Sequence, residues 1–169
     1  GNEPLLDADV HYNYVPENTV MESLTYEKHG DYIEITGCDK TATEVVIPAE
    51  IDGVAVGEIG SEAFKECREL VSVTISEGVH YIWDAAFENC ESLTSVTFPE
   101  TLSSIRDNAF KGCTSLESIS IPADVYKGKG AFMDCVNLKN VQIAEGGDEF
   151  DYLAEYCFAG CTSLETIVI

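Results

Sequence analysis

Basic side chains are scarce in this sequence of 169 residues: 9 Lys and Arg stand against 31 Asp and Glu, which gives a formal net charge of −22. So few cations cannot neutralise a row of phosphates, which argues against nucleic acid and an anionic membrane surface as partners. The sequence also lacks an apolar run of the ~18–20 residues that a transmembrane helix needs. It opens on Gly1 without a Met or a signal peptide, and we expect a targeting segment to have been removed.

Motifs for metal binding and catalysis are missing as well. No Cys-x-x-Cys pair provides a zinc site, and no D-x-[DN]-x-[DN]-G loop provides a calcium site. The histidines, His11, His29 and His80, have no Ser, Cys or carboxylate at a spacing typical of a catalytic triad. The sequence therefore predicts no metal, no cofactor and no enzymatic activity. A hydrolase with a pair of carboxylates stays open as an alternative, although abundance of carboxylates is not an arrangement of them.

What the sequence does contain is a repeat of the pattern Phe-x-x-Cys-x-x-Leu, whose final Leu recurs after 23, 23, 22 and 26 residues. The copies begin at Phe64, Phe87, Phe110, Phe132 and Phe158. A Val/Ile-x-Ile/Phe step after each Leu has the alternation of a short strand, and the Ala-Phe-x-x-Cys stretch has the spacing of a short helical turn. One such coil cannot bury its apolar face, whereas coils stacked ~4.8 Å apart can. The repeat therefore predicts an α/β solenoid.

The limits of the repeat divide the chain into three parts. Residues 1–23 show no period and are rich in Asp, Glu, Asn and Pro, which indicates a linker or extended arm. Residues 24–41 contain two alternating runs around residues 28–31 and are predicted to form a β-hairpin that caps the solenoid. Residues 42–169 are predicted to be the solenoid itself, about five coils plus a final strand.

Three coils depart from the common period. The first has five extra residues between Ile51 and Ile59, a later one lacks its second-strand Ile near Gly128, and another has extra residues at 144–149. The residues predicted to return to the core after that loop are Phe150, Leu153, Cys157 and Phe158. The strand that ends at Ile169 has nothing over it, so we expect exposed apolar surface there, covered by a longer chain or a partner.

These repeats resemble the leucine-rich repeats of the bacterial surface antigen type, usually called BspA-like. The motifs that carry the resemblance are Ile59-Gly60-x-x-Ala63-Phe64-x-x-Cys67-x-x-Leu70 with its copies, the endings Ile47-Pro48, Phe98-Pro99 and Ile121-Pro122, and the stretch 43–53. The resemblance covers roughly residues 24–169. It implies a right-handed leucine-rich-repeat solenoid in secreted or cell-surface proteins of host-associated bacteria, used for adhesion or protein binding and without catalytic residues.

We therefore predict a non-catalytic extracellular module that binds or adheres to protein or glycan ligands, secreted or at the cell surface. The acidic composition favours neutral glycans or cationic protein patches as ligands and disfavours nucleic acid. A passive structural spacer within a larger surface protein is the alternative.

Two surfaces are candidates for binding. The first gathers large amphipathic side chains beside the second strands, with Arg106 and Lys129 close behind. Its members are His80, Tyr81, Trp83, Tyr126 and Tyr152. The second is the outward face of the first strands, which is small, polar and uncharged. Its members are Ser72, Thr74, Ser95, Thr97, Ser118, Ser120, Asn140 and Gln142. Aromatic rings make good binding anchors, but strand propensity alone also accounts for both rows.

Five of the seven cysteines occupy one repeat position, so each plays the same part. They are Cys67, Cys90, Cys113, Cys135 and Cys161. We predict a buried column of free thiols, because parallel side chains in a ladder disfavour the ~90° dihedral angle of a disulfide. Cys38 and Cys157 are out of phase with the column, and the sequence does not favour a bridge between them.

Overall fold

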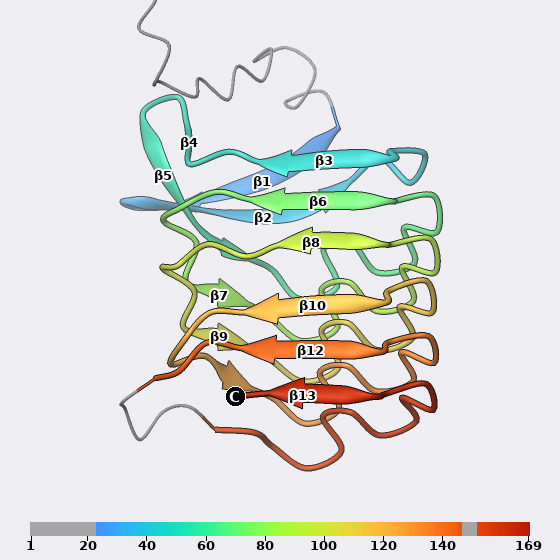
Figure 1. Ribbon diagram of the computed structural model, residues 1–169. Helices are drawn as coiled ribbons and strands as arrows, with labels where there is room; N and C mark the ends of the chain where they lie inside the picture. The colour runs from blue at the N-terminus through green and yellow to red at the C-terminus, as the bar shows by residue number, and fades with distance from the viewer. Residues whose placement is uncertain (1–22, 147–151) are drawn as a thin grey trace, which may run out of the picture.

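Residues 23–146 and 152–169 are described in the computed structural model, and they form a ladder of stacked coils (Figure 1). His11, Phe150 and the first 22 residues of the expected linker lie outside the described residues. A coil contributes one strand to the front of the ladder and, in most coils, a shorter strand to the back. None of the described segments forms a helix with the length and apolar character that crossing a bilayer requires.

The front strands lie one above another in Figure 1. They are β3 (Glu44–Ile47), β6 (Ser72–Ile75), β8 (Ser95–Thr97), β10 (Ser118–Ile121), β12 (Asn140–Ile143) and β13 (Thr166–Val168). The back strands are β5 (Val54–Ile59), β7 (Tyr81–Ile82), β9 (Ser104–Ile105) and β11 (Tyr126–Lys127). Where neighbouring front strands or neighbouring back strands pair, they run parallel. Residues at the same repeat position lie opposite each other, as Val45 does to Val73 and Val73 to Val96. The repeat period sets this register, because each coil returns the same residue type to the same height.

Two hairpins lie at the N-terminal end of the ladder. The first joins β1 (Leu24–His29) to β2 (Tyr32–Cys38), and β2 pairs in parallel with β5, so this hairpin completes the back sheet. The second joins β4 (Glu50–Ile51) to β5 through Asp52 and Gly53, which have φ angles of 50° and 77°. Two positive φ angles are what the tight turn of a two-residue hairpin requires. This second hairpin accommodates the five extra residues of the first coil.

The core is a set of columns that run the length of the ladder. Phe64, Phe87, Phe110 and Phe132 are fully buried, and their rings stack with centroids 4.8, 4.9 and 5.3 Å apart. Phe87 and Phe110 therefore have a ring above and below them, and each coil buries the apolar face that its neighbour leaves open. The residues of the inner coils that were predicted to be core from their phase in the repeat are buried, except for Val96 and Phe98, which are half-buried.

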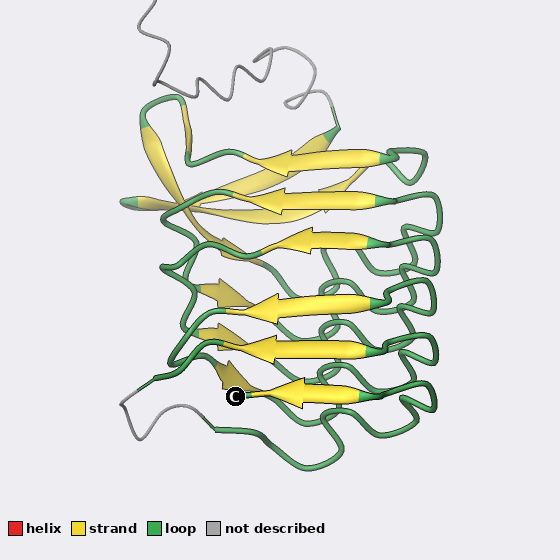
Figure 2. Cartoon of the chain, in the orientation of Figure 1, coloured by secondary structure: helices red, strands yellow, loops and turns green. Residues whose placement is uncertain are grey.

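The predicted helical turns, and the α/β class with them, are wrong for the described residues, in which Figure 2 shows only strands and loops. The Phe64 N–H donates to the Ala86 carbonyl of the next coil at 2.7 Å, instead of to a carbonyl four residues earlier. Ala85 and Asn89, on either side of the buried Ala86–Phe87 pair, have φ angles of 54° and 59°. Left-handed residues four apart cannot continue an α-helix, so the spacing of Ala, Phe and Cys reflects successive tight turns.

The cysteine column is buried as predicted, except for Cys161, which is half-buried, and it makes a repeated hydrogen bond. The thiol of Cys90 donates to the Phe64 carbonyl at 3.1 Å, and that of Cys113 donates to the Phe87 carbonyl at 3.2 Å. Cys135 and Cys161 make the same bond one and two coils further on. A thiol is small enough for the core and adds a second donor to a Phe carbonyl that already accepts a backbone N–H of its own turn, as Phe64 does from Cys67.

In the coil that lacks the second-strand Ile, a lysine takes the place of that residue in the core. Lys127 stands in line with Ile82 and Ile105 where the second-strand Ile is missing, and its buried ammonium donates to the Val125 carbonyl at 2.6 Å. Gly128 follows it, so close to the backbone of the previous coil that a Cβ would lie 2.6 Å from the Arg106 carbonyl carbon.

In the final coil, Cys157 is buried as predicted, whereas Phe158 is only half-buried and packs against the edge of the core. The prediction for Leu153 is wrong, because this residue is 48% exposed. No further coil of the described chain covers it. Ile167 and Ile169 are likewise exposed, as expected for the last strand of a stack.

The phenylalanine column should dominate stability. We expect Phe87→Ala to lower the free energy of unfolding by roughly 3–5 kcal/mol, because it leaves a cavity between two stacked rings. Ser95→Ala, on the exposed face of β8, should cost less than about 0.5 kcal/mol. Urea denaturation of both variants measures these changes, and equal losses would contradict the assignment of the buried face.

The left-handed turn positions should respond to substitution with opposite signs. Gly112 has a φ of 74°, and a Cβ there would lie 2.3 Å from the Asn89 Oδ1 atom, so Gly112→Ala should cost about 1–3 kcal/mol. Ala85 has a φ of 54°, so Ala85→Gly relieves strain and should stabilise by about 0.5–1 kcal/mol. Denaturation midpoints, compared at an unchanged slope of unfolding free energy against denaturant concentration, test both variants. If both changes destabilise the protein, the backbone at Ala85 is not strained.

Candidate binding surfaces

An aromatic ridge runs along the outside of the back sheet, and we define it as Tyr81, Trp83, Arg106, Tyr126 and Tyr152. Tyr81 lies on β7 and Trp83 directly follows that strand, while Tyr126 begins β11. These side chains point outward because the alternate positions, such as Ile82, point into the core. Four of the five candidates from the sequence are therefore brought together.

The members of the aromatic ridge contact one another in series. The rings of Tyr81 and Trp83 are 5.8 Å apart, and those of Tyr126 and Tyr152 are stacked at 5.8 Å with an interplanar angle of 10°. Arg106 joins these two pairs. Its guanidinium carbon lies 5.2 Å from the centre of the Trp83 ring and 5.5 Å from that of Tyr126.

Arg106 bridges an interruption in the row of aromatic rings. Ser104 lies in register between Tyr81 and Tyr126, so one coil supplies no ring and the row of rings does not continue from every coil to the next. Arg106, two residues after Ser104, occupies this gap, and cation–π contacts replace ring stacking there. Arg106 makes no ion pair with any described residue, despite the acidic composition. Sequence reasoning placed Arg106 near the ridge without recognising that it holds the two halves together.

Trp83 and His80, which lie near the same end of the ridge, are held by different contacts. Trp83 donates from Nε1 to the Glu58 Oε2 atom at 3.0 Å, so a residue of the preceding coil sets the orientation of the indole. His80, the fifth candidate, lies to one side: its Nδ1 contacts the Gly78 carbonyl at 2.6 Å within its own turn. Its ring is tilted and 6.4 Å from that of Tyr81.

The exposed area of the ridge lies mainly on its tyrosines. Tyr81 is 38% and Tyr152 is 55% exposed, whereas Trp83 and Tyr126 are half-buried by their neighbours. Rings held by contacts on two sides lose little rotamer freedom when a ligand binds. The ridge is therefore a preordered surface of aromatic faces with a cation at its centre.

The face of the front strands is the other predicted surface, and its side chains are exposed except for the half-buried Ser72. It is flat and polar, with few large side chains. The ladder beneath it is broken, because β8 and β10 are not hydrogen-bonded and the described front strands form two sheets of three. The break coincides with Phe98, which stands where Ile75 and Ile121 stand in neighbouring coils and packs edge-on against Phe110 at 5.6 Å.

A shallow pocket of about 310 Å³ lies at this break. Three of the predicted front-face residues line it, namely Thr97, Ser120 and Gln142. Phe98 and Ile121 contribute its apolar wall. The pocket has no charged group other than Glu100, so it offers hydrogen bonds and a small apolar wall but no large anchor.

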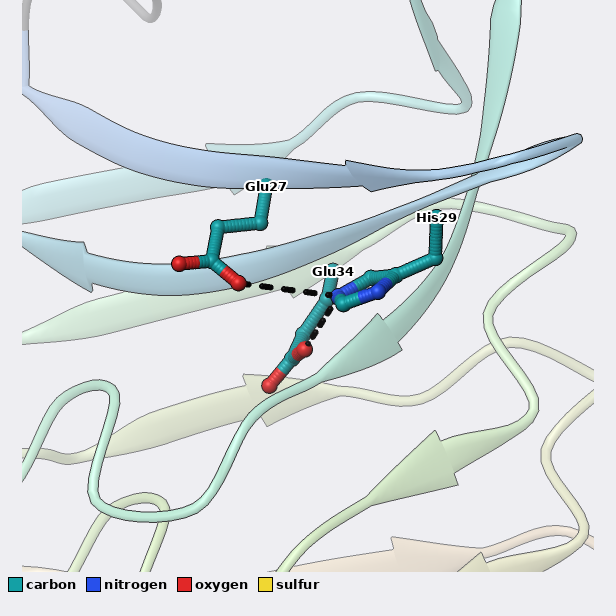
Figure 3. Close-up of side chains that lie close together, drawn as sticks. All are labelled: Glu27, His29 and Glu34. Carbon is teal, nitrogen blue, oxygen red and sulfur yellow. Dashed lines mark hydrogen bonds and ion pairs between the residues drawn. The ribbon is translucent and has the colours of Figure 1, made fainter.

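One group of potential metal ligands lies on the N-terminal hairpin (Figure 3). The His29 Nε2 atom is 2.8 Å from the Glu34 Oε2 atom and 3.8 Å from the Glu27 Oε2 atom. The three could offer one nitrogen and two carboxylate oxygens to a divalent cation. Each side chain is exposed or half-buried, and the imidazole already bonds the carboxylate, so we assign an ion-paired surface cluster. Sequence reasoning had treated His29 alone, since these residues meet only across the hairpin.

The stacked parallel strands and the repeated Phe, Cys and Leu columns define a leucine-rich-repeat β-solenoid. The family model of the BspA-type leucine-rich repeat region matches residues 57–169 with six copies, and the chain belongs to this family. Repeats of this family are typically non-catalytic and are consistent, in general terms, with a protein-binding or adhesion module.

Several solved structures are similar to the chain. A leucine-rich cell surface protein of Faecalibacterium prausnitzii is 27% identical over 86% of this chain and 37% of its own, with a TM-score of 0.72. A leucine-rich repeat protein of T. pallidum is 28% identical over 91% of this chain and 81% of its own, with a TM-score of 0.66. One from Bacteroides capillosus is 30% identical over 73% of this chain and 96% of its own, also with a TM-score of 0.66. No curated protein matches the chain significantly.

The role of Arg106 can be tested through Trp83, the only tryptophan of the chain. Removing the guanidinium in Arg106→Ala uncovers the indole, so its fluorescence emission should move to longer wavelength and acrylamide should quench it more strongly. Loss of two cation–π contacts should also cost about 1–2 kcal/mol of stability. Lys129→Ala, which removes a cation from the Tyr156 ring instead, is the matched control and should leave the emission unchanged. Unchanged emission in Arg106→Ala would show that the ridge is not joined there.

Proposed function

We propose that the chain is a non-catalytic, extracellular binding or adhesion module whose aromatic ridge contacts protein or neutral glycan ligands. The observation that carries the proposal is the continuous series of contacts from Tyr81 through Arg106 to Tyr152, in which three coils present aromatic faces and the coil between them contributes Arg106. The cell-surface description of the Faecalibacterium prausnitzii protein and the BspA-type repeats support an extracellular location.

The chemistry of the ridge favours ligands with apolar faces and hydrogen-bonding edges. Aromatic rings stack on the C–H faces of sugars and on apolar protein side chains, and tyrosine hydroxyls hydrogen-bond at the rim. The guanidinium of Arg106 lies over the Trp83 and Tyr126 rings, and its N–H groups can donate to ligand carbonyl or hydroxyl oxygens. The net charge of −22 repels polyanions, which supports neutral or cationic partners.

The front face is the weaker of the two surfaces as an anchor. Its side chains are short and polar, and such residues contribute little to most interfaces, in which Tyr, Trp and Arg supply most of the binding energy. The pocket at Thr97 and Ser120 gives this face a local concavity. The pocket is the alternative binding site, and substitutions at Thr97 and Ser120 probe it.

A passive spacer is the second candidate function. Its support is that the chain spans only 37% of the similar Faecalibacterium prausnitzii protein, so a segment of this kind can occur within a longer array. Exposed Ile167, Val168 and Ile169 also offer an apolar edge on which another coil could stack. A spacer predicts no ligand that depends on any one face of the coils.

A binding screen against host glycoproteins and neutral glycans tests the proposal. The double variant Tyr81→Ala/Tyr152→Ala removes the two most exposed ridge rings and leaves the Trp83–Arg106 contact in place. Its affinity for a ligand found in the screen should fall by about 1–3 kcal/mol. Titration by calorimetry measures this loss, and circular dichroism with thermal melting confirms that the fold is intact.

The matched control is Thr97→Ala/Ser120→Ala, which changes the front-face pocket by a similar number of polar atoms. It should leave the affinity within about 0.5 kcal/mol of the unchanged chain. Loss of binding in this variant, with binding retained by the ridge variant, would move the site to the front face. Ligands that both variants bind as well as the unchanged chain, or no ligand from the screen, would support the spacer.

A further inference from the structure

Two cysteines meet at the junction between the N-terminal hairpin and the first repeat. Cys38 is the last residue of β2, and Cys67 belongs to the first Phe-x-x-Cys-x-x-Leu copy. Their Sγ atoms lie 3.3 Å apart, within hydrogen-bond distance. Cys67 is fully buried and Cys38 is half-buried, so one sulfur of the pair is near solvent.

Cys67 also differs from the rest of its column. The later column cysteines donate their thiols to a Phe carbonyl of the preceding coil, as Cys90 does to Phe64. Cys67 belongs to the first copy, so the described chain offers it no such Phe carbonyl, and its recorded thiol partner is Cys38. The hairpin therefore supplies a second thiol at the position where the solenoid would otherwise supply an acceptor.

The surroundings of this pair favour a thiolate. The pKa of Cys67 is lowered to about 7, first because the Cys38 thiol donates to its sulfur and then because the Lys40 ammonium lies nearby, which together outweigh burial. The same hydrogen bond raises the pKa of Cys38, and burial adds to it. Lys40 is held in place by donating to the Lys65 carbonyl. By contrast, burial raises the pKa of Cys90 to about 12, so that column thiol is inert at neutral pH.

We propose that Cys38 and Cys67 form a redox-active pair that oxidises to a disulfide joining the N-terminal hairpin to the solenoid, while the other column cysteines remain free thiols. Formation of the bond requires the sulfurs to move from 3.3 Å to about 2.05 Å, a shift within reach of side-chain rotation at the end of a strand.

The oxidant is a low-molecular-weight disulfide, and the exchange balances. One protein thiolate attacks a sulfur of the external disulfide, which breaks its S–S bond and expels one thiolate. The second protein sulfur then attacks the protein sulfur of the mixed disulfide and expels the other thiolate. The protein loses two protons and two electrons, and the external disulfide gains both and leaves as two thiols. Cys38, near solvent, is the sulfur that the external disulfide reaches. As it attacks, it passes its proton to the hydrogen-bonded Cys67 thiolate. Cys67 then gives that proton to the expelled external thiolate and completes the bond.

The disulfide would secure the end of the ladder where unfolding can begin. Terminal elements of a stack have a neighbour on one side only, so they open at lower free energy than inner coils. A bond between residues 38 and 67 closes a loop that contains β3, β4 and β5, and it lowers the entropy of the opened state. Oxidation would then protect the terminal hairpin in an oxidising environment.

Peptide mapping of the whole chain tests the proposal. The reduced protein is incubated at pH 8 in buffers of reduced and oxidised glutathione, quenched with acid, alkylated under denaturing conditions and digested with trypsin. We expect a peptide in which residues 29–40 are joined to residues 66–68, lost on reduction with dithiothreitol, and five alkylated cysteines. The Tm of the oxidised protein should exceed that of the reduced protein by about 5–10 °C.

Two serine variants complete the design. Cys38→Ser should give no joined peptide and a Tm that no longer depends on the glutathione ratio. Cys157→Ser removes a buried cysteine outside the pair and should retain both effects. The proposal would be overturned if the unchanged chain, incubated in its folded state with oxidised glutathione alone, still gave seven alkylated cysteines. Disulfides between column neighbours in place of the 29–40 and 66–68 link would overturn it equally.

Discussion

The stacking of one coil on the next is the interaction on which the whole structure depends. A single coil has too little apolar surface to fold alone, and its turn N–H groups point along the axis of the ladder, as the bond from Phe64 to Ala86 shows. The same translation places Phe87 between Phe64 and Phe110. Hydrogen bonds and ring stacking therefore impose one register on every column, and a residue at any position acts with its equivalents above and below.

That register also creates the candidate surface. Outward positions repeat as regularly as inward ones, so side chains that are 20 or more residues apart in sequence become neighbours, as Trp83 and Arg106 do. A ridge assembled in this way spans several coils without any loop to order it. At Ser104 the row of rings is interrupted, and Arg106 bridges the missing ring and brings a cation into an acidic protein.

Where the sequence was misleading, hydrogen bonding explains why. Ala86 and Phe87 have a spacing that fits a helical turn, but spacing does not reveal whether an N–H bonds within its coil or to the next one. The break between β8 and β10 was equally hidden, because Phe98 fits the apolar pattern and only its larger ring sets it apart from Ile75. The Asp52–Gly53 pair did carry a readable hairpin signal for the extra residues of the first coil.

The sequence by itself determined the solenoid, its register and its buried columns, because the period of the Phe, Cys and Leu positions leaves one way to bury them. Only the tertiary structure decided which residues meet from different coils or from the hairpin. Arg106 reached Trp83 and Tyr126, Cys38 reached Cys67, and no local pattern encoded either contact. Periodicity specifies a residue's face and height, whereas contacts between irregular positions depend on how the hairpin and the coils pack together in space.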